Sequence, residues 1–208
     1  MSTPANRRPL KTRSAAWARA LASALVRGGV TPDSISVASV LVSILGAYFI
    51  LFTSAPISLA LTAVCVQLRL LCNMLDGMVA IEGGRKSACG ALYNELPDRI
   101  ADSLFIVALG YAIGTPWLGW FGALASALTA YIRAMGGALG FEQDFRGPLA
   151  KQHRMAVLTA ALLLAIVEHY WRGTQWVLVL AAWVIAVGSA ITCITRTRAI
   201  AGKLKAGP

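Results

Sequence analysis

Two adjoining segments decide how this chain folds: Asn73-Met-Leu-Asp76-Gly77-Met-Val-Ala80 and Gly90-Ala-Leu-Tyr-Asn94-Glu95-Leu-Pro-Asp98-Arg-Ile-Ala-Asp102. Five of the nine acidic residues lie between positions 73 and 102, although the protein as a whole is strongly apolar. A carboxylate at membrane depth is costly unless it is paired, hydrated or bound to a cation. This concentration of carboxylates therefore indicates a functional site.

The spacing of the polar residues predicts that each segment is one face of a helix. Asp76 and Ala80 follow Asn73 at i+3 and i+7, and Asp98 and Asp102 follow Asn94 at i+4 and i+8. Residues at these intervals share a helix face. We therefore expect two facing helices that direct oxygen ligands toward one point between them.

The composition predicts an all-α integral membrane protein. The chain has 208 residues, of which 57% are hydrophobic and 13% charged, and this leaves no room for a separate soluble domain of ordinary size. The net charge of +10 comes from basic residues that flank apolar segments, so we expect contact with anionic membrane lipids and not with nucleic acid. The four cysteines have no metal-binding spacing and are interpreted as inert thiols.

The chain divides into a basic N-terminal segment and a membrane domain. Residues 1–30 mix arginines with Trp17 and leucines, which predicts an amphipathic helix on the membrane surface; a solvated basic tail is the alternative. Residues 31–208 are predicted to form a six-helix transmembrane domain with a short basic C-terminal tail. Its predicted spans are residues 34–52, 57–81, 88–113, 118–139, 155–170 and 175–193.

The distribution of basic residues predicts the orientation. Six spans alternate the loops between two sides, and Arg172 is the one Lys or Arg on the side opposite the termini. The positive-inside rule then places both termini and both halves of the acidic motif in the cytoplasm.

The residue types of the motif suit phosphoryl transfer. Hard cations such as Mg²⁺ prefer carboxylate and carbonyl oxygens and often bridge them to substrate phosphates. The candidate metal ligands are Asn73, Asp76, Asn94 and Asp98, with Glu95 and Asp102 nearby. The small residues Gly77, Ala80 and Gly90 leave room for a flat ligand, and Arg69, Arg133, Lys151 and Arg154 are placed to neutralise phosphate oxygens.

At these residues the chain resembles the CDP-alcohol phosphotransferases, integral membrane enzymes that make phospholipids. Their signature is Asp-x2-Asp-Gly-x2-Ala-Arg-x8-Gly-x3-Asp-x3-Asp. With every spacing kept, it falls on Asn73, Asp76, Gly77, Ala80, Ile81, Gly90, Asn94 and Asp98. The entry to the first span at Thr31-Pro32-Asp33, the segment Tyr131-Ile-Arg133-Ala and the six spans are also similar, so the resemblance covers nearly the whole chain.

The chain departs from the signature at three positions. Asn73 and Asn94 replace aspartates, and Ile81 replaces an arginine. An amide ligates through its oxygen but carries no charge, so the matched ligands carry two negative charges instead of four. Glu95 and Asp102 are the natural compensators, Arg85 is the candidate substitute for the missing arginine, and the pattern resembles a divergent branch of the family that has these asparagines.

The resemblance implies a reaction in a prokaryotic cytoplasmic (inner) membrane. Two divalent ions, Mg²⁺ or Mn²⁺, hold the diphosphate of a CDP-linked donor, expected to be CDP-diacylglycerol; a polar alcohol attacks, and CMP leaves. The resemblance assigns Asp98 as general base and metal ligand, and it assigns the other candidate ligands of the motif to the metal. It also implies that the protein is a homodimer. The positions facing the nucleotide are Gly77, Ala80 and Gly90, with Arg69 and Arg85 near the phosphates. The acceptor residues are taken to be Arg133, Lys151, His153 and Arg154.

Other interpretations of the same residues stay open. Asp76 and Asp98 can be structural partners of Arg69 and Arg99, and Glu95 can pair with Arg99 at i+4. Ile81 and the two asparagines suit an inactive homologue that binds lipid or partners without turnover. A transporter is disfavoured, because the polar residues gather at one membrane face and the two halves of the chain show no repeat.

Overall fold

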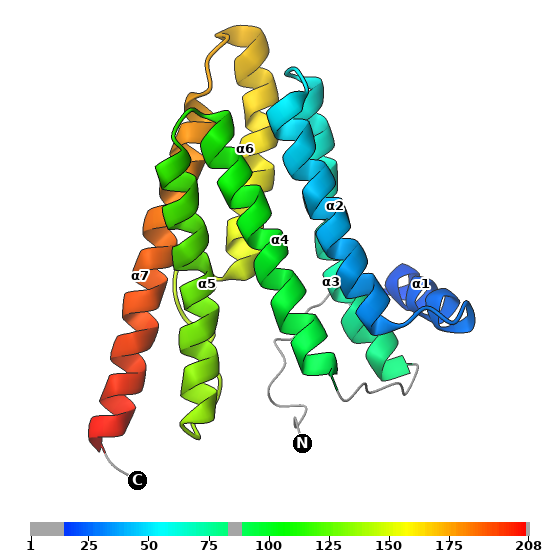
Figure 1. Cartoon of the computed structure of the whole chain (residues 1–208), viewed down its shortest axis with the longest axis vertical. Coiled ribbons are helices and arrows are strands. Elements are labelled where there is room, and N and C mark those ends of the chain that lie inside the picture. Colours follow the sequence, from blue (N-terminus) through cyan, green and yellow to red (C-terminus); the bar gives the residue numbers. More distant parts are fainter. Residues whose placement is uncertain (1–14, 83–88, 207–208) are drawn as a thin grey trace.

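The computed structural model describes residues 15–82 and 89–206, which form seven α-helices and no strand (Figure 1). The predicted all-α class is confirmed. The helices are α1 (Ala16–Arg27), α2 (Pro32–Phe52), α3 (Ile57–Glu82), α4 (Gly90–Ala112), α5 (Pro116–Ala138), α6 (Lys151–Trp171) and α7 (Trp176–Ala206).

Helices α2 to α7 form one bundle whose short turns lie at one end and whose longer connections lie at the other. In Figure 1 the turns after α2, α4 and α6 are at the top, and the C-terminal end of α7 is at the bottom. Helix α2 packs against α3 and α4, α5 packs against α4 and α7, and α6 lies between α3 and α7. The main core contains Phe105, Leu109, Leu158, Leu162 and Ile185.

Four helices, α2, α3, α6 and α7, are long and apolar enough to cross a membrane by length and composition. Helix α4 carries Glu95, Asp98, Arg99 and Asp102 in its first half, and these charges lower its mean hydropathy. It nevertheless runs without a break through Pro97, whose side chain is buried. The helix bounds lie within a few residues of five of the predicted spans.

Helix α7 is longer than predicted, because it continues from the expected end at residue 193 to Ala206. The extension packs against neighbouring elements: Arg196 is buried and donates hydrogen bonds to the carbonyl oxygens of Thr129 and Arg146, and Ile200 lies against Gly136 of α5. The basic segment predicted as a tail is therefore helical.

Helix α1 packs on the helix that carries the first half of the motif. Ala18 and Ala22 are fully buried in a cluster with Met74, Met78 and Val79 of α3. Trp17 and Leu21 remain exposed on α1. Residues 16–27 of the segment predicted as an interfacial amphipathic helix are therefore helical, and the place of α1 on a membrane surface stays a prediction; residues 1–14 lie outside the described part of the chain.

Helices α4 and α5 cross at van der Waals contact through two glycines. A Cβ added to Gly119 would lie 2.9 Å from the Cα atom of Gly110 and 3.0 Å from the carbonyl oxygens of Ile106 and Val107. All three are backbone atoms, which cannot move aside as a flexible side chain would. The approach of α4 to α5 therefore requires a residue without a side chain at position 119.

Gly119→Ala should destabilise the fold by about 1–3 kcal/mol through overpacking. Thermal unfolding in one detergent measures the effect as a lowered midpoint. Gly202→Ala on α7 is the matched control, because a Cβ there meets nothing within 4 Å. Equal midpoints for the two variants would contradict the close crossing.

Candidate active site

Three buried carboxylates gather where α3 and α4 approach the end of the bundle that bears the longer connections. Asp76 of α3 is 6% exposed, and Asp98 and Asp102 of α4 are 7% and 2% exposed. Asp98 and Asp76 lie close enough for their charges to interact. The structure thus brings the aspartates of the two halves of the motif, on α3 and α4, to one place.

Asp76 is held by a residue of a third helix. The Ser36 hydroxyl on α2 donates a hydrogen bond of 2.8 Å to Oδ2 of Asp76, and both side chains are buried. Sequence reasoning did not single out Ser36. The one sequence feature that could have pointed to Ser36 is its place just after the helix start at Thr31-Pro32. There the Thr31 hydroxyl accepts a hydrogen bond from the backbone N–H of Ser34.

Asp98 is contacted by two cations of the chain. The Arg69 guanidinium lies 3.1 Å from Oδ1 of Asp98 and also donates to its backbone carbonyl at 3.3 Å. The Lys151 ammonium, on the first residue of α6, contacts Oδ2. Both carboxylate oxygens of the predicted general base are therefore engaged within the protein.

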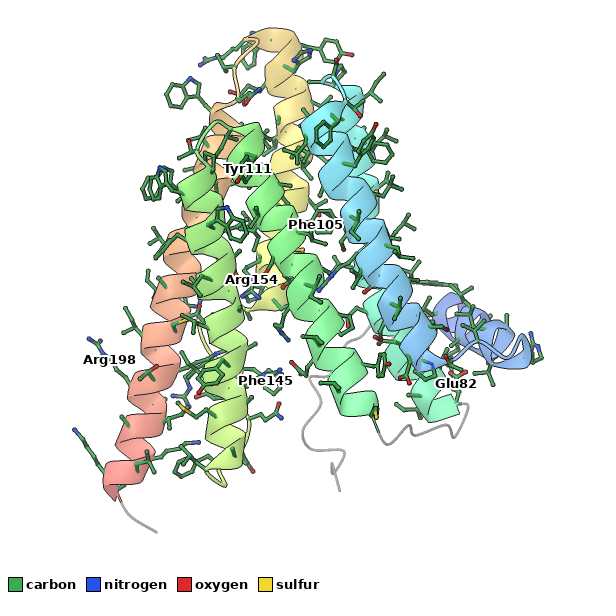
Figure 2. All side chains as sticks on the ribbon, in the orientation of Figure 1. Glu82, Phe105, Tyr111, Phe145, Arg154 and Arg198 are labelled. Carbon is green, nitrogen blue, oxygen red and sulfur yellow. The ribbon has the colours of Figure 1, made fainter. Side chains whose placement is uncertain are left out.

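Asp102 extends the same network one helical turn further along α4. One oxygen lies 2.6 Å from Arg69, and the other accepts a hydrogen bond of 3.2 Å from Arg154. Arg154 is 1% exposed and also donates to the carbonyl oxygen of Leu149 at 2.9 Å; Figure 2 shows its side chain inside the bundle. The network joins α3, α4 and α6 through alternating charges.

Glu95 has different partners. Its two carboxylate oxygens accept hydrogen bonds from Arg99 at 2.7 Å and from Arg133 of α5 at 2.6 Å. The Arg133 guanidinium also lies over the ring of Phe145, 5.4 Å from its centroid. This geometry favours the ion-pair interpretation of Glu95 over a direct metal contact, and a metal role for Glu95 stays a prediction.

The remaining predicted residues take the following places. Asn73, Gly77 and Ala80 are half-buried on α3, and Gly90 begins α4. Asn94 lies on α4, but its side chain is outside the described part of the structure, as is the whole of Arg85. His153 is exposed and its Nδ1 lies 3.1 Å from the carbonyl oxygen of Pro148, so the structure does not bring it to the carboxylates.

Arg196 is a further candidate that sequence reasoning missed, because it was assigned to a basic tail. Its guanidinium donates 2.9 Å and 2.7 Å hydrogen bonds to the carbonyl oxygens of Arg146 and Thr129. Arg133 and Arg154 lie close enough for their charges to interact with it. Arg133 and Arg154 also pair with Glu95 and Asp102, whereas Arg196 has no carboxylate partner among the described ion pairs and is the guanidinium best placed to attract an anion.

The oxygen donors fit a hard divalent cation that also binds substrate phosphates. In the described part of the chain no three His, Cys, Asp or Glu side chains are arranged to hold a metal ion, so the protein alone does not complete a coordination shell there. Asp76 forms no ion pair among the described residues, and Asn73 lies one turn before it on the same helix. A cation at Asp76 and Asp98 therefore needs amide and phosphate oxygens as further ligands.

Comparisons with known proteins agree with this geometry, although no family model matches the chain. The phosphatidylinositol phosphate synthase of Mycolicibacterium smegmatis is 29% identical over 207 residues, which cover 92% of this chain and 87% of that protein. The archaetidylinositol phosphate synthase of Aeropyrum pernix is 36% identical over 141 residues, covering 67% of this chain and 69% of that protein.

Comparison with solved structures also finds similarity to a phosphatidylinositol phosphate synthase. A crystal structure of the Mycobacterium tuberculosis phosphatidylinositol phosphate synthase with CDP-DAG bound matches with a TM-score of 0.75 and 26% identity, over 89% of this chain and 94% of that chain. A second crystal structure of that synthase, in complex with manganese and citrate, matches with a TM-score of 0.73 over 88% of each chain.

Arg69→Met should lower the free energy of unfolding by about 3–5 kcal/mol, because it leaves the buried carboxylates of Asp98 and Asp102 without their shared cation. Chemical unfolding followed by tryptophan fluorescence measures the loss. Arg99→Met is the control: it removes a cation whose partner Glu95 is half exposed, and it should change stability by less than about 1 kcal/mol. Equal losses in the two variants would show that the buried ion pairs of Arg69 contribute no more to the free energy of unfolding than the exposed pair of Arg99.

Proposed function

The chain belongs to the family of CDP-alcohol phosphotransferases, and on that premise we propose that its donor is CDP-diacylglycerol and its acceptor a phosphorylated inositol. The family predicted from the motif is confirmed. The protein is a membrane transferase that moves a phosphatidyl or related phosphoalcohol group from a CDP-linked donor to an alcohol. Both curated relatives are named for inositol phosphate products, and a solved relative carries CDP-DAG.

The observation that carries the proposed acceptor is the meeting of Arg154 and Arg196 at Thr129 of α5, where they donate to its hydroxyl at 3.4 Å and to its carbonyl oxygen at 2.7 Å, with Arg133 one turn further along the same helix. An uncharged acceptor such as glycerol offers these guanidiniums no anion. A phosphate group on the acceptor accepts charge-assisted hydrogen bonds from them and fixes the position of the attacking hydroxyl. Lys151 enters the same region from the start of α6, and His153 stays a predicted contributor.

The proposed chemistry at the motif follows from the charges of its side chains and of the donor diphosphate. A bound divalent cation, supported as manganese in a solved relative, would neutralise the donor's diphosphate and polarise its phosphorus. We assign Asn73, Asp76, Asn94 and Asp98 to two such ions, Mg²⁺ or Mn²⁺, with Asp102 and Glu95 orienting neighbouring groups. We assign Gly77, Ala80 and Gly90 to the approach of the nucleotide to the helix backbones, and Arg69 and Arg85 to its phosphates.

Asp98 is the proposed general base. Its carboxylate accepts the proton of the acceptor hydroxyl as that oxygen attacks the phosphorus distal to cytidine, and CMP leaves with the original phosphate oxygen. Arg69, which contacts both Asp98 and Asp102, holds the carboxylate in place for this step. Burial excludes water that would otherwise compete with the acceptor hydroxyl as nucleophile.

We further propose that α2 to α7 all span the membrane and that α1 lies on its cytoplasmic surface. The support is the sequence: Arg172 is the one basic residue on the side of the short turns, and the positive-inside rule then places the motif at the cytoplasmic face of a prokaryotic inner membrane. Exposed Trp17 and Leu21 suit α1 to the lipid interface. A homodimer is proposed on the family resemblance.

CMP release by the purified protein in lipid tests the function. With CDP-diacylglycerol and Mn²⁺, release should depend on inositol phosphate and stay low with serine, glycerol or glycerol phosphate. Asp98→Asn should reduce the rate by about a hundredfold or more, because it removes the proton acceptor. Glu142→Gln, an exposed acid outside the site, is the matched control. Release with glycerol phosphate alone would overturn the inositol assignment, and no release with any alcohol would favour an inactive homologue.

Arg133→Gln should raise the KM for inositol phosphate about tenfold or more and change the KM for CDP-diacylglycerol little, since it removes a charge-assisted hydrogen bond to the acceptor phosphate. Steady-state kinetics with each substrate varied in turn measures both constants. Arg198→Gln is the control, because that side chain points outward from α7 (Figure 2). An equal rise in both constants would argue against an acceptor site at Arg133.

A further inference from the structure

Lys151 takes a position on Asp98 that conflicts with the role proposed for that carboxylate. Its ammonium contacts Oδ2 of Asp98, while Arg69 contacts Oδ1 at 3.1 Å. Cations on both oxygens make a carboxylate a weaker ligand for a divalent ion and a weaker proton acceptor than a free carboxylate. Loss of one of these two contacts would strengthen both properties.

Of the two cations, Lys151 is the one that can leave. Arg69 is fully buried and has two further partners, the backbone carbonyl of Asp98 and the carboxylate of Asp102. The Lys151 side chain is 21% exposed, and Asp98 is its one partner among the described hydrogen bonds and ion pairs. Its four-carbon stem allows the ammonium to move several ångströms without any change in the backbone.

The place of Lys151 in α6 also argues against a purely structural role. It is the first residue of the helix, where the backbone N–H groups already give a positive potential. A cation at this end is unfavourable for helix stability, and a carboxylate would be favourable. The lysine therefore depends on Asp98 for its position, and a competing cation on Asp98 would release it.

The formal charge of the cluster sets how strongly a metal can bind. Asp76, Asp98 and Asp102 are opposed by Arg69, Lys151 and Arg154, so these six described side chains sum to zero. A divalent cation would add two positive charges to a buried, neutral cluster, which is unfavourable. The two ionised phosphates of a CDP-linked donor offset the charge of one such cation.

We propose that Lys151 occupies the cation position on Asp98 in the free protein, so that divalent metal binds tightly only together with the donor's diphosphate. This inference rests on the proposed function. When metal and diphosphate arrive, the ammonium moves from Asp98 to the phosphate oxygens. Metal and donor then bind with positive coupling, and each raises the affinity of the other by the same factor.

The test measures Mn²⁺ affinity by electron paramagnetic resonance on the full-length protein in nanodiscs without donor. Lys151→Met keeps the length of the stem and removes the charge, so it should bind Mn²⁺ roughly tenfold or more tightly than the unaltered protein. Lys151→Arg keeps the charge and should leave the affinity low. Lys205→Met, on the exposed end of α7, is the matched control and should change nothing.

The outcomes separate this inference from the proposed function. Unaltered protein that binds Mn²⁺ with CDP-diacylglycerol, together with a Lys151→Met variant whose donor-free affinity is unchanged, would overturn the inference alone. Failure of every variant to bind Mn²⁺ even with CDP-diacylglycerol would overturn both. Lys151→Gln is the second neutral variant if Lys151→Met does not fold. Loss of the fold in both would show that the Lys151–Asp98 contact is structural, against the proposal.

Discussion

The structure depends on the cost of burying charge. Three carboxylates lie buried in a largely apolar bundle: Arg69, Lys151 and Arg154 meet Asp98 and Asp102, and the Ser36 hydroxyl donates a hydrogen bond to Asp76. These cations come from α3 and α6, and the carboxylates come from α3 and α4. The same contacts that neutralise the cluster therefore fix how three helices pack, and the site and the fold share one set of interactions.

Periodicity and charge distribution were sufficient to predict the helices and the meeting of Asp76 with Asp98. The motif spacing puts the polar residues of each segment on one helix face, and the expectation that these two faces meet follows from that spacing. The choice of partners was not predictable, because it depends on packing between helices: Arg69 reaches across to α4, Glu95 turns toward Arg133, and Ser36 arrives from α2. The length of α7 was missed for the same reason, since Arg196 is held by α5 and the α5–α6 loop.

The departures from the family signature change the net charge of the site and therefore its affinity for a metal ion. Asparagines at positions 73 and 94 leave fewer negative charges at the motif, and the cations around Asp98 and Asp102 bring the described cluster to neutrality. Such a site has little attraction for a free metal ion. Its attraction is for a metal that arrives with phosphate, which is the form in which a CDP-linked donor presents it.

The central claim is that the α3–α4 carboxylates bring metal and donor diphosphate together. Electron–nuclear double resonance between bound Mn²⁺ and the phosphorus nuclei of CDP-diacylglycerol measures this directly. The account predicts a strong manganese–phosphorus coupling in the unaltered protein, its loss in Asp76→Asn and its retention in Asp144→Asn, a loop carboxylate paired with Arg146. An unchanged coupling in Asp76→Asn would contradict the claim, because the metal–phosphate complex would then form without this cluster.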